Sequence, residues 1–328
     1  MHVLILGAAG MVGRKLVDQL CEAGSVAGQE ITAMTLVDVI EPESPAADKH
    51  AVNWAVSTAA ADISVRSEVD ALIAHKPDII FNLAAIVSGE AETDFDKGYA
   101  VNLNGSHNLF EAIRQQNYRP KVVFTSSIAV FGAPFPDAID DEFLSAPLTS
   151  YGVQKACSEL LLMDYSRKGF IDGIAIRLPT VVIRPGKPNK AASGFFSNIL
   201  REPLNGQEAV LPVSLDVRHW MASPKRSAGF LIHAANLDTN RLGARRALSM
   251  PGIPVTVGEM IEALERVAGP ERAALIRHEP DETITRIVDG WPRNFNTSRA
   301  LELGFTADNS MDEIIRIYIE EELGGQLG

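Results

Sequence analysis

The first half of the sequence alternates short, continuous runs of apolar residues with longer amphipathic segments. Such runs are typical of strands buried on both faces, and the segments between them predict helices that cover those faces. The predicted strands are 2–6, 32–37, 52–56, 78–82, 121–126 and 173–178, and the predicted helices are 11–23, 66–75, 94–116 and 150–168. This order predicts an α/β fold of Rossmann type, a doubly wound parallel sheet whose ligands bind beyond the carboxyl ends of the strands.

After about residue 180 the pattern becomes looser. Helices are predicted near 194–202, 256–268 and 311–323, and short strands near 208–214 and 246–250. A single core rarely grows beyond about 250–300 residues, so this chain predicts a large domain with a smaller, interleaved lobe. We expect the Rossmann domain at 1–180 with a return segment at about 213–236, and a C-terminal substrate lobe at 181–212 and 237–328. The loops 132–150 and 184–194, rich in Pro, Gly and charged residues, are candidate functional segments.

Composition restricts the partners. The chain has 30 Lys and Arg against 42 Asp and Glu, a net charge of -12, which repels nucleic acid and anionic membranes. No segment approaches the roughly 18 apolar residues of a membrane span, and the N-terminal apolar run predicts a strand rather than a signal peptide. Cys21 and Cys157 are expected to be reduced thiols in a cytoplasmic protein. Any anionic ligand must therefore be held by local groups.

Directly after the first predicted strand, glycine occupies every third position, at Gly7, Gly10 and Gly13. Gly7 permits a tight turn, Gly10 lets the backbone approach a pyrophosphate, and Gly13 lets the following helix lie close to the strand. Met11 and Val12 lie in the first turn of that helix, where free N–H groups and the helix dipole favour phosphate. The spacing predicts a dinucleotide site.

The ends of the next strands extend this site. Asp38 ends the second strand, where a carboxylate binds the adenosine ribose and repels the additional phosphate of NADP, so NAD is the expected cofactor. Asp62 and Ile63 follow the third strand and are expected to bracket the adenine. Leu83 and Ala84 follow the fourth strand and are expected to lie along the dinucleotide.

Two candidate catalytic residues are predicted one turn apart on the helix 150–168. Tyr151 and Lys155 are spaced i,i+4 and so share a face, while Ser126 and Ser127 end the fifth strand. Oxidation of an alcohol requires a base for the hydroxyl proton, and a nearby cation favours the phenolate form of a tyrosine. Serine would hold the substrate oxygen, and Asn102 would complete a proton path.

These motifs together resemble the extended short-chain dehydrogenase/reductase family, also called the epimerase/dehydratase family. The matching motifs, in order, are Gly7-x-x-Gly10-x-x-Gly13, Asp38, Asp62, Asn82-Leu-Ala-Ala85, Asn102-Leu-Asn-Gly105, Ser126-Ser-Ile-Ala-Val-Phe-Gly132, Tyr151-x-x-x-Lys155 and Arg177-Leu-Pro-Thr180. The resemblance implies NAD as cofactor, with Pro179 among its contacts. It also implies Tyr151 as the base, Lys155 as its partner and Ser127 at the substrate hydroxyl, in a homodimer built from helices near 100–116 and 150–168.

The resemblance also narrows the reaction. Dehydratases of this family carry Thr-Asp-Glu at 127–129, where this chain has Ser-Ile-Ala, so elimination of water is disfavoured. A nucleotide-sugar epimerase remains an alternative, although 184–226 is short for a nucleotide-sugar lobe. The stretches 177–206 and 217–236 are similar to members that oxidise the C2 hydroxyl of a small sugar acid. A simple dehydrogenase is therefore the preferred interpretation.

A small sugar acid needs a fixed cation for its carboxylate, and a guanidinium suits this role best. Arg184, just beyond a strand ending near Ile183, is the first candidate. Val87 and Ser88, which follow the fourth strand, are expected to line the same pocket.

Arg218, His219 and Trp220 form a second candidate cluster, in which Arg or His would contact polar groups and Trp would wall the pocket. His219 has no second His, Cys or carboxylate at ligand spacing, so no metal site is predicted.

Two other functions are weighed against a dehydrogenase. An epimerase would regenerate NAD in every cycle and release no NADH. A non-catalytic NAD-sensing protein of the same fold is disfavoured because both Tyr151 and Lys155 are present. A serine hydrolase is excluded because neither Ser126 nor Ser127 lies in a G-x-S-x-G turn.

Overall fold

The computed structural model describes residues 1–45, 52–186 and 193–328, which fall into two units. The first unit contains Met1–Val130, Thr149–Arg177 and Ala228–Leu248, and the second contains Phe131–Leu148, Leu178–Ser227 and Ser249–Gly328. Both units are thus assembled from separated stretches of the sequence. Most of the candidate loop 184–194 lies outside the described residues.

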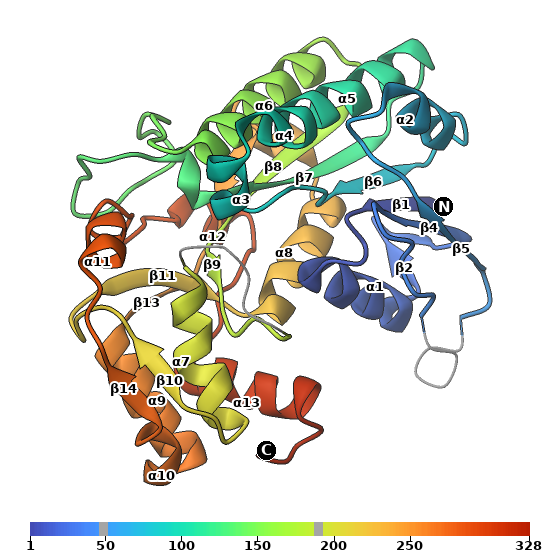
Figure 1. Cartoon of the computed structure of the whole chain (residues 1–328). Coiled ribbons are helices and arrows are strands. Elements are labelled where there is room, and N and C mark those ends of the chain that lie inside the picture. Colours follow the sequence, from blue (N-terminus) through green and yellow to red (C-terminus); the bar gives the residue numbers. More distant parts are fainter. Residues whose placement is uncertain (46–51, 187–192) are drawn as a thin grey trace. The chain divides into compact units, whose positions relative to one another are not determined.

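A seven-stranded sheet forms the centre of the first unit, in the order β12-β8-β7-β6-β1-β4-β5 (Figure 1). Its strands are β1 His2–Leu6, β4 Ala33–Asp38, β5 Ala55–Ala60, β6 Ile79–Asn82, β7 Lys121–Ser127, β8 Asp172–Leu178 and β12 Ala247–Ser249. The pairs β5–β4, β4–β1, β1–β6 and β6–β7 are parallel. The chain winds outward through β4 and β5 and then returns to the other side of β1 at β6, which confirms the predicted doubly wound α/β fold. Ligands are therefore expected at the carboxyl ends of β1 and β6.

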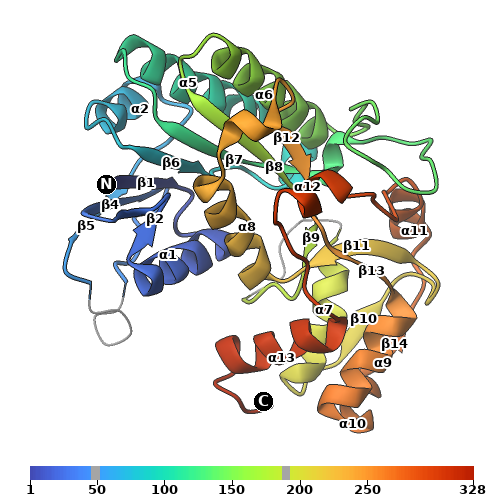
Figure 2. The ribbon, with the colours of Figure 1, turned by 180° about the vertical axis from the view of Figure 1, so that it is seen from behind.

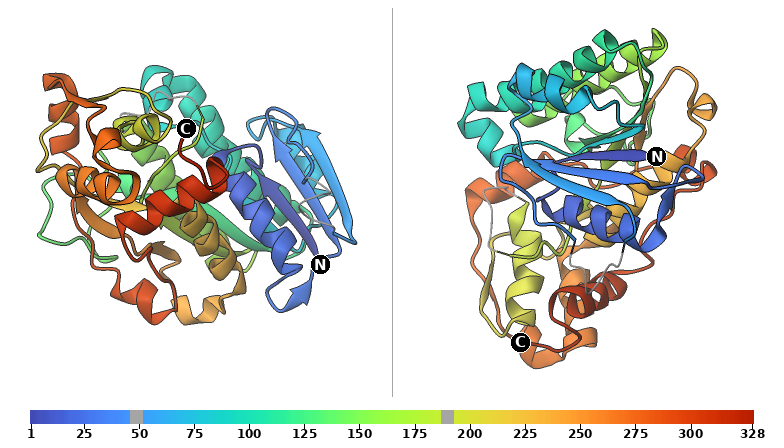
Figure 3. Two further views of the ribbon diagram at one scale, coloured as in Figure 1. Left: turned by 90° about the horizontal axis from the view of Figure 1, so that it is seen from below. Right: turned by 90° about the vertical axis from the view of Figure 1, so that its right-hand side faces the viewer.

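Helices cover both faces of this sheet. One face carries α2 (Arg66–Ile73), α5 (Gly105–Gln115) and α6 (Ser150–Arg167), and the other carries α1 (Met11–Ala23) and the later part of α8 (Pro224–Asn236) (Figures 1 and 2). The right-hand view of Figure 3 shows the sheet between these two layers. The inner strands of the sheet are largely buried on both faces, as their continuous apolar runs predict, whereas the edge strand β5 is not.

Two predicted elements differ in the structure. The strand predicted at 52–56 lies instead at β5, Ala55–Ala60, because this edge strand is half-exposed and its AVSTAA sequence is no longer a continuous apolar run. The helix predicted at 94–116 is divided into α4 (Phe95–Gly98), the π-helical segment η1 (Tyr99–Asn104) and α5.

The remaining elements of the first unit are short. They are β2 Ser25–Val26, β3 Gln29–Glu30, α3 Ser88–Thr93, the 3-10 turn η2 Ile128–Val130 and the 3-10 turn η3 Thr239–Leu242.

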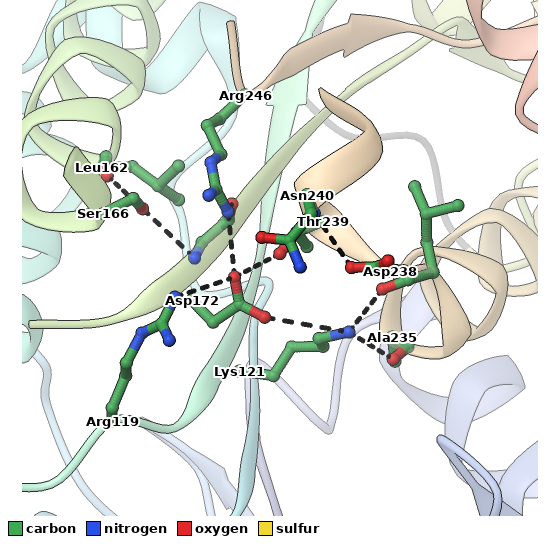
Figure 4. A network of polar contacts seen from close by, with 12 residues as sticks. Arg119, Lys121, Leu162, Ser166, Asp172, Ala235, Asp238, Thr239, Asn240 and Arg246 are labelled. Carbon is green, nitrogen blue, oxygen red and sulfur yellow. Dashed lines mark hydrogen bonds and ion pairs between the residues drawn. The ribbon is translucent and has the colours of Figure 1, made fainter. Parts of the chain in front are cut away.

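The segment that follows α8 belongs to the first unit, where a network of polar contacts attaches it to the starts of β7 and β8 (Figure 4). Asp172 accepts hydrogen bonds from Arg246 at 2.9 Å and from the Thr239 hydroxyl. Lys121 donates to the carbonyl of Leu237 at 2.6 Å and lies 3.9 Å from Asp172. These contacts explain why 237–248, expected in the C-terminal lobe, lies with the sheet.

The second unit contains two small sheets and several helices. Its strands are β9 Thr180–Val181, β10 Ala209–Leu211, β11 Arg218–Ala222, β13 Ile253–Thr256 and β14 Ile276–His278, and its helices are α7 Gly194–Leu204, α9 Val257–Ala268, α10 Pro270–Ala273, α11 Glu282–Asp289, α12 Ser298–Glu302 and α13 Met311–Glu322. One sheet has the order β13-β11-β9, and β10 pairs with β14. Apolar residues of α7, α9 and α13 form its buried core.

Within the expected return segment 213–236, the strand β11 does not join the main sheet, because it pairs with β9 and β13 in the second unit. The strand that joins the main sheet is β12, only three residues long, and Ala228–Asn236 of α8 returns as a helix. None of the helices in the described part of the chain combines the length and the apolar character needed to cross a membrane.

Candidate active site

The glycine turn after β1 is packed too tightly for side chains. Gly7 has φ of +88°, and a Cβ there would lie 2.7 Å from the backbone nitrogen of Ala84. A Cβ on Gly13 would lie 2.2 Å from the carbonyl oxygen of Gly7. Gly10 is the N-cap of α1, which begins at Met11, and it provides no side-chain cap for the N–H groups of the first turn. A pyrophosphate fits this arrangement of bare backbone at a helix start.

Asp38, at the end of β4, links the glycine turn to the next strand. Its carboxylate accepts hydrogen bonds from the N–H of Ala9 at 3.1 Å and of Val39 at 2.8 Å. The N–H groups of Gly7 and Ala8 donate to the carbonyl of Val37. These bonds fix a carboxylate beside the glycine turn, where the ribose role was predicted.

Asp62 and Ile63 follow β5. The Asp62 carboxylate accepts from the N–H of Ser64 at 2.8 Å. The Ile63 side chain is buried, and a Cβ added to Gly105 would lie 2.7 Å from it. Ile63 thus packs against the start of α5, and its predicted contact with adenine stays a prediction.

The segment after β6 lies under the glycine turn. Leu83 donates its N–H to the carbonyl of Leu6 at 2.8 Å, and Ala84 is the residue that a larger side chain at Gly7 would strike. Val87 is partly exposed and precedes Ser88, the first residue of α3. The backbone of Leu83 and Ala84 therefore requires a glycine at position 7, and the predicted contacts of these two residues with the cofactor stay a prediction.

Asn102, in η1, uses its amide to hold the segment after β6. Its Oδ1 accepts from the N–H of Ile86 at 2.9 Å, and its Nδ2 donates to Gln154 Oε1 on α6 at 2.7 Å and to the carbonyl of Ile86 at 3.2 Å. The backbone carbonyl of Asn102 accepts from the hydroxyls of Ser106 and Ser158. Asn102 therefore joins three elements of the predicted site, and its place in a proton path stays a prediction.

Tyr151 and Lys155 lie one turn apart on α6, as predicted. Thr149 caps this helix by accepting the N–H of Gly152 at 3.1 Å, which fixes its first turn. Lys155 is 1% exposed, and its Nζ donates to the carbonyl of Thr125 at 2.8 Å. Nζ also lies 4.7 Å from the ring centre of Phe124 and 5.7 Å from that of Tyr151. Burial lowers the pKa of Lys155 to about 7, and the nearby Glu159 opposes this shift.

The two serines at the end of β7 are in different environments. Ser126 is buried and donates its hydroxyl to Glu159 Oε1 at 2.5 Å. Ser127 is partly exposed, and its Oγ accepts the N–H of Ala129 at 3.1 Å. The accessible hydroxyl therefore belongs to Ser127, whereas Ser126 belongs to a buried network.

Sequence reasoning missed Glu159, which joins this network. Its carboxylate accepts from Arg177 Nε at 2.9 Å and from Arg177 Nη2 at 2.7 Å, and both side chains are buried. The available signals were an acidic residue four positions after Lys155 on one helix and an arginine within the buried strand β8.

In the second unit, Arg184 is held by neighbouring residues. Its Nη2 donates to the hydroxyl of Ser193 at 2.9 Å, and its Nε donates to the carbonyl of Val181 at 3.0 Å. Its backbone N–H donates to the hydroxyl of Ser197 on α7. The guanidinium is half-buried and fixed in orientation, as a carboxylate site requires.

His219 and Trp220, on β11, are buried in the second unit. The ring of His219 contacts the Thr180 hydroxyl at 2.6 Å and the carbonyl of Pro292 at 3.0 Å, and it stacks on Phe196. Burial lowers the pKa of His219 to about 4, so the ring is neutral at pH 7.

Trp220 donates its Nε1 to the carbonyl of Met250 at 3.0 Å. The side chain of Arg218 lies near Glu259 and is 43% exposed. Pro179 lies between β8 and β9. Of this cluster, His219 and Trp220 are buried, whereas Arg218 is exposed. No group of three or more His, Cys, Asp or Glu side chains suited to a metal ion occurs among the described residues.

Comparison with known proteins agrees with this geometry. The model of the NAD dependent epimerase/dehydratase family matches residues 3–224. Two similar proteins are named D-erythronate dehydrogenase: one from Cupriavidus necator is 43% identical, covering 98% of both chains, and one from Haemophilus influenzae is 41% identical, covering 98% of this chain and 100% of its own. A crystal structure described as the nucleoside-diphosphate-sugar epimerase from Agrobacterium tumefaciens is 60% identical, with a TM-score of 0.96, and covers 100% of this chain and 96% of that chain.

Proposed function

Because this chain belongs to the NAD dependent epimerase/dehydratase family, we propose that it oxidises the C2 hydroxyl of a small sugar acid, D-erythronate, to 2-oxo-erythronate. NAD is the cofactor. The observation that carries the substrate assignment is that two relatives, 43% and 41% identical over nearly their whole lengths, bear the name D-erythronate dehydrogenase. The site geometry supplies the groups that such an oxidation requires.

The backbone after β1 would hold the pyrophosphate of NAD. Gly7 and Gly10 lie in the turn before α1, and Met11 and Val12 lie in its first turn. A Cβ at Gly7 would strike the backbone of Leu83 and Ala84, so this turn admits only glycine there. Asp38 would accept hydrogen bonds from the adenosine ribose. When bound, NAD accepts the hydride that leaves C2 of the substrate.

Proton removal is assigned to Tyr151. The phenolate oxygen of Tyr151 would take the proton of the C2 hydroxyl, while the hydroxyl of Ser127 donates a hydrogen bond to the same oxygen. The Nζ of Lys155, buried 5.7 Å from the Tyr151 ring centre, favours the phenolate by its charge. Tyr151 would therefore hold the hydroxyl proton as the hydride leaves C2, with Ser127 and Lys155 assisting.

Arg184 is proposed to bind the substrate carboxylate. Replacing it by methionine should raise the KM for D-erythronate about 100-fold, because a charge-assisted pair is lost, and should leave the KM for NAD unchanged. Arg184→Lys should recover only part of this loss, since an ammonium cannot bind two oxygens in the same plane. Equal KM values for all three enzymes would remove Arg184 from this role.

The mechanism is tested with Tyr151→Phe. The variant should lose about 10³-fold in kcat for NADH formation, while the affinity for NAD, measured by fluorescence titration, stays within about twofold. NADH formation at the wild-type rate by the folded variant would refute Tyr151 as the base.

A second candidate function is epimerisation of a nucleotide-linked sugar, favoured by the description of the 60% identical Agrobacterium structure. The two functions differ in their products. A dehydrogenase releases one NADH for each substrate oxidised, whereas an epimerase releases none. A spectrophotometric screen of four- to six-carbon sugar acids, with UDP- and GDP-linked sugars as the comparison, therefore separates them.

We also propose that the enzyme works in the cytoplasm as a homodimer formed by the helices near 100–116 and 150–168. Leu160, on α6, is 63% exposed, so a charged substitution there tests this interface without disturbing the core. Cys21 and Cys157 are both free thiols, as in proteins of a reducing compartment. Sedimentation of Leu160→Glu, expected to be monomeric, tests the interface.

A further inference from the structure

Lys155 and Glu159 bind consecutive residues at the end of β7. Lys155 Nζ donates to the carbonyl of Thr125 at 2.8 Å, and one helical turn later the Glu159 carboxylate accepts the hydroxyl of Ser126 at 2.5 Å. The residue that follows is Ser127, the proposed ligand of the substrate oxygen. One face of α6 therefore attaches to the strand end that carries this serine.

Arg177 forms an ion pair with Glu159 in this buried position. The guanidinium donates to both carboxylate oxygens, at 2.9 Å and 2.7 Å, and the two side chains are 8% and 3% exposed. Charge-assisted pairs of this kind fix orientation as well as charge. Glu159 is thus a carboxylate shared between a permanent cation on β8 and the region of Lys155.

The charge of Lys155 depends on its surroundings because the side chain is fully buried. The pKa of Lys155 is lowered to about 7, because burial disfavours the ammonium more strongly than the nearby Glu159 carboxylate favours it. The ionisable groups gathered round Lys155 are Tyr151 and Glu159 on α6 and, through Glu159, Arg177 on β8. A neutral Lys155 would no longer favour the phenolate of Tyr151.

We infer that Glu159 is a positioning residue for the proposed dehydrogenase reaction: it keeps Lys155 protonated and fixes the Ser126–Ser127 end of β7 against α6. This inference rests on the proposed Ser-Tyr-Lys mechanism. A purely structural ion pair between α6 and β8 is the alternative, and it makes a different prediction about charge.

The test compares two variants that change the charge in opposite directions. Glu159→Gln removes the negative charge but keeps a group that can accept from Ser126, and Arg177→Gln removes the positive charge and leaves the carboxylate. The titration of Lys155 is followed by NMR of its ε carbon in lysine-labelled protein without substrate, with the signal assigned by Lys155→Met.

Glu159→Gln should lower the Lys155 midpoint by about one pH unit, and Arg177→Gln should raise it, since an unneutralised carboxylate favours the ammonium. The pH above which kcat/KM falls should move in the same two directions. Midpoints that stay at the wild-type value, or that move in the same direction in both folded variants, would overturn the inference.

Arg177 is left without its carboxylate in Glu159→Gln, and this variant can fail to fold. Glu159→Asp keeps the ion pair but withdraws the carboxylate by one carbon, so it provides a second measurement. It should lower the Lys155 midpoint by less than one unit and lower kcat several-fold; a folded Glu159→Asp with wild-type midpoint and kcat would contradict the inference. The Tyr151→Phe assay stays separate, because retained turnover there refutes the base itself, whereas unmoved midpoints refute only Glu159.

Discussion

The two ends of β7 and β8 carry ion clusters with similar groups and different surroundings. At the starts of these strands, Asp172 pairs with Arg246 at 2.9 Å and lies near Lys121 (Figure 4). At their ends, Glu159 pairs with Arg177 at 2.7 Å beside Lys155.

The two lysines differ in what they contact. Lys121, 17% exposed, donates to the carbonyls of Ala235 and Leu237 and so holds the end of α8. Lys155, 1% exposed, donates to the carbonyl of Thr125 and faces aromatic rings. Lys121 is stabilised by the carbonyl groups that accept its hydrogen bonds. Lys155 is a desolvated side chain, and its burial as an ammonium lowers the stability of the fold. This difference agrees with a structural role for Lys121 and with the catalytic role proposed for Lys155.

The largest effect is expected from Lys155→Met. Loss of the cation should lower kcat about 10³-fold, while the free energy of unfolding should rise by about 1 kcal/mol because a buried charge is replaced by an apolar chain of similar length. Urea denaturation and the NADH assay measure the two quantities. A variant that loses both stability and activity would show that Lys155 supports the fold as Lys121 does.

Lys121→Met is the matched substitution at the other end of the same strand. It should lower the free energy of unfolding by about 2 kcal/mol, because two carbonyls lose a donor and Asp172 loses a nearby cation, and it should leave kcat within about twofold. Urea denaturation tests this, with Lys155→Met as the reference. A drop in kcat comparable to that of Lys155→Met would remove the contrast between the two ends.

A smaller effect is expected at Asp38, which also lies at the carboxyl edge of the sheet. The double variant Asp38→Ser/Val39→Arg should shift the ratio of kcat/KM for NAD over NADP about tenfold toward NADP, because the carboxylate that repels the 2′-phosphate is removed and a cation is added. Val39 is 63% exposed, so the new arginine is accommodated at the surface. An unchanged cofactor preference would refute the ribose role of Asp38.

The carboxyl edge was the more predictable of the two ends. Gly7, Asp38 and the pair Tyr151 and Lys155 are identified by spacing along single strands, turns and helices, and their local order is retained in the structure. The starting edge has no such spacing, since Lys121, Asp172 and Arg246 come from distant positions. These residues associate through contacts between distant parts of the sequence, which a local sequence pattern cannot predict. The place of 237–248 in the first unit depends on the same contacts.

The alternation of apolar runs and amphipathic segments determined the doubly wound fold, because a strand buried on both faces needs apolar residues along its whole length. The glycine spacing likewise determined the turn after β1. The tertiary structure alone decided which of two adjacent serines is accessible. The hydroxyl of Ser126 donates a hydrogen bond to Glu159, which lies 33 positions away along the chain, whereas Ser127 is partly exposed. Adjacent residues of a strand point to opposite faces, so their environments depend on what packs there, and that is fixed by the fold rather than by the sequence around them.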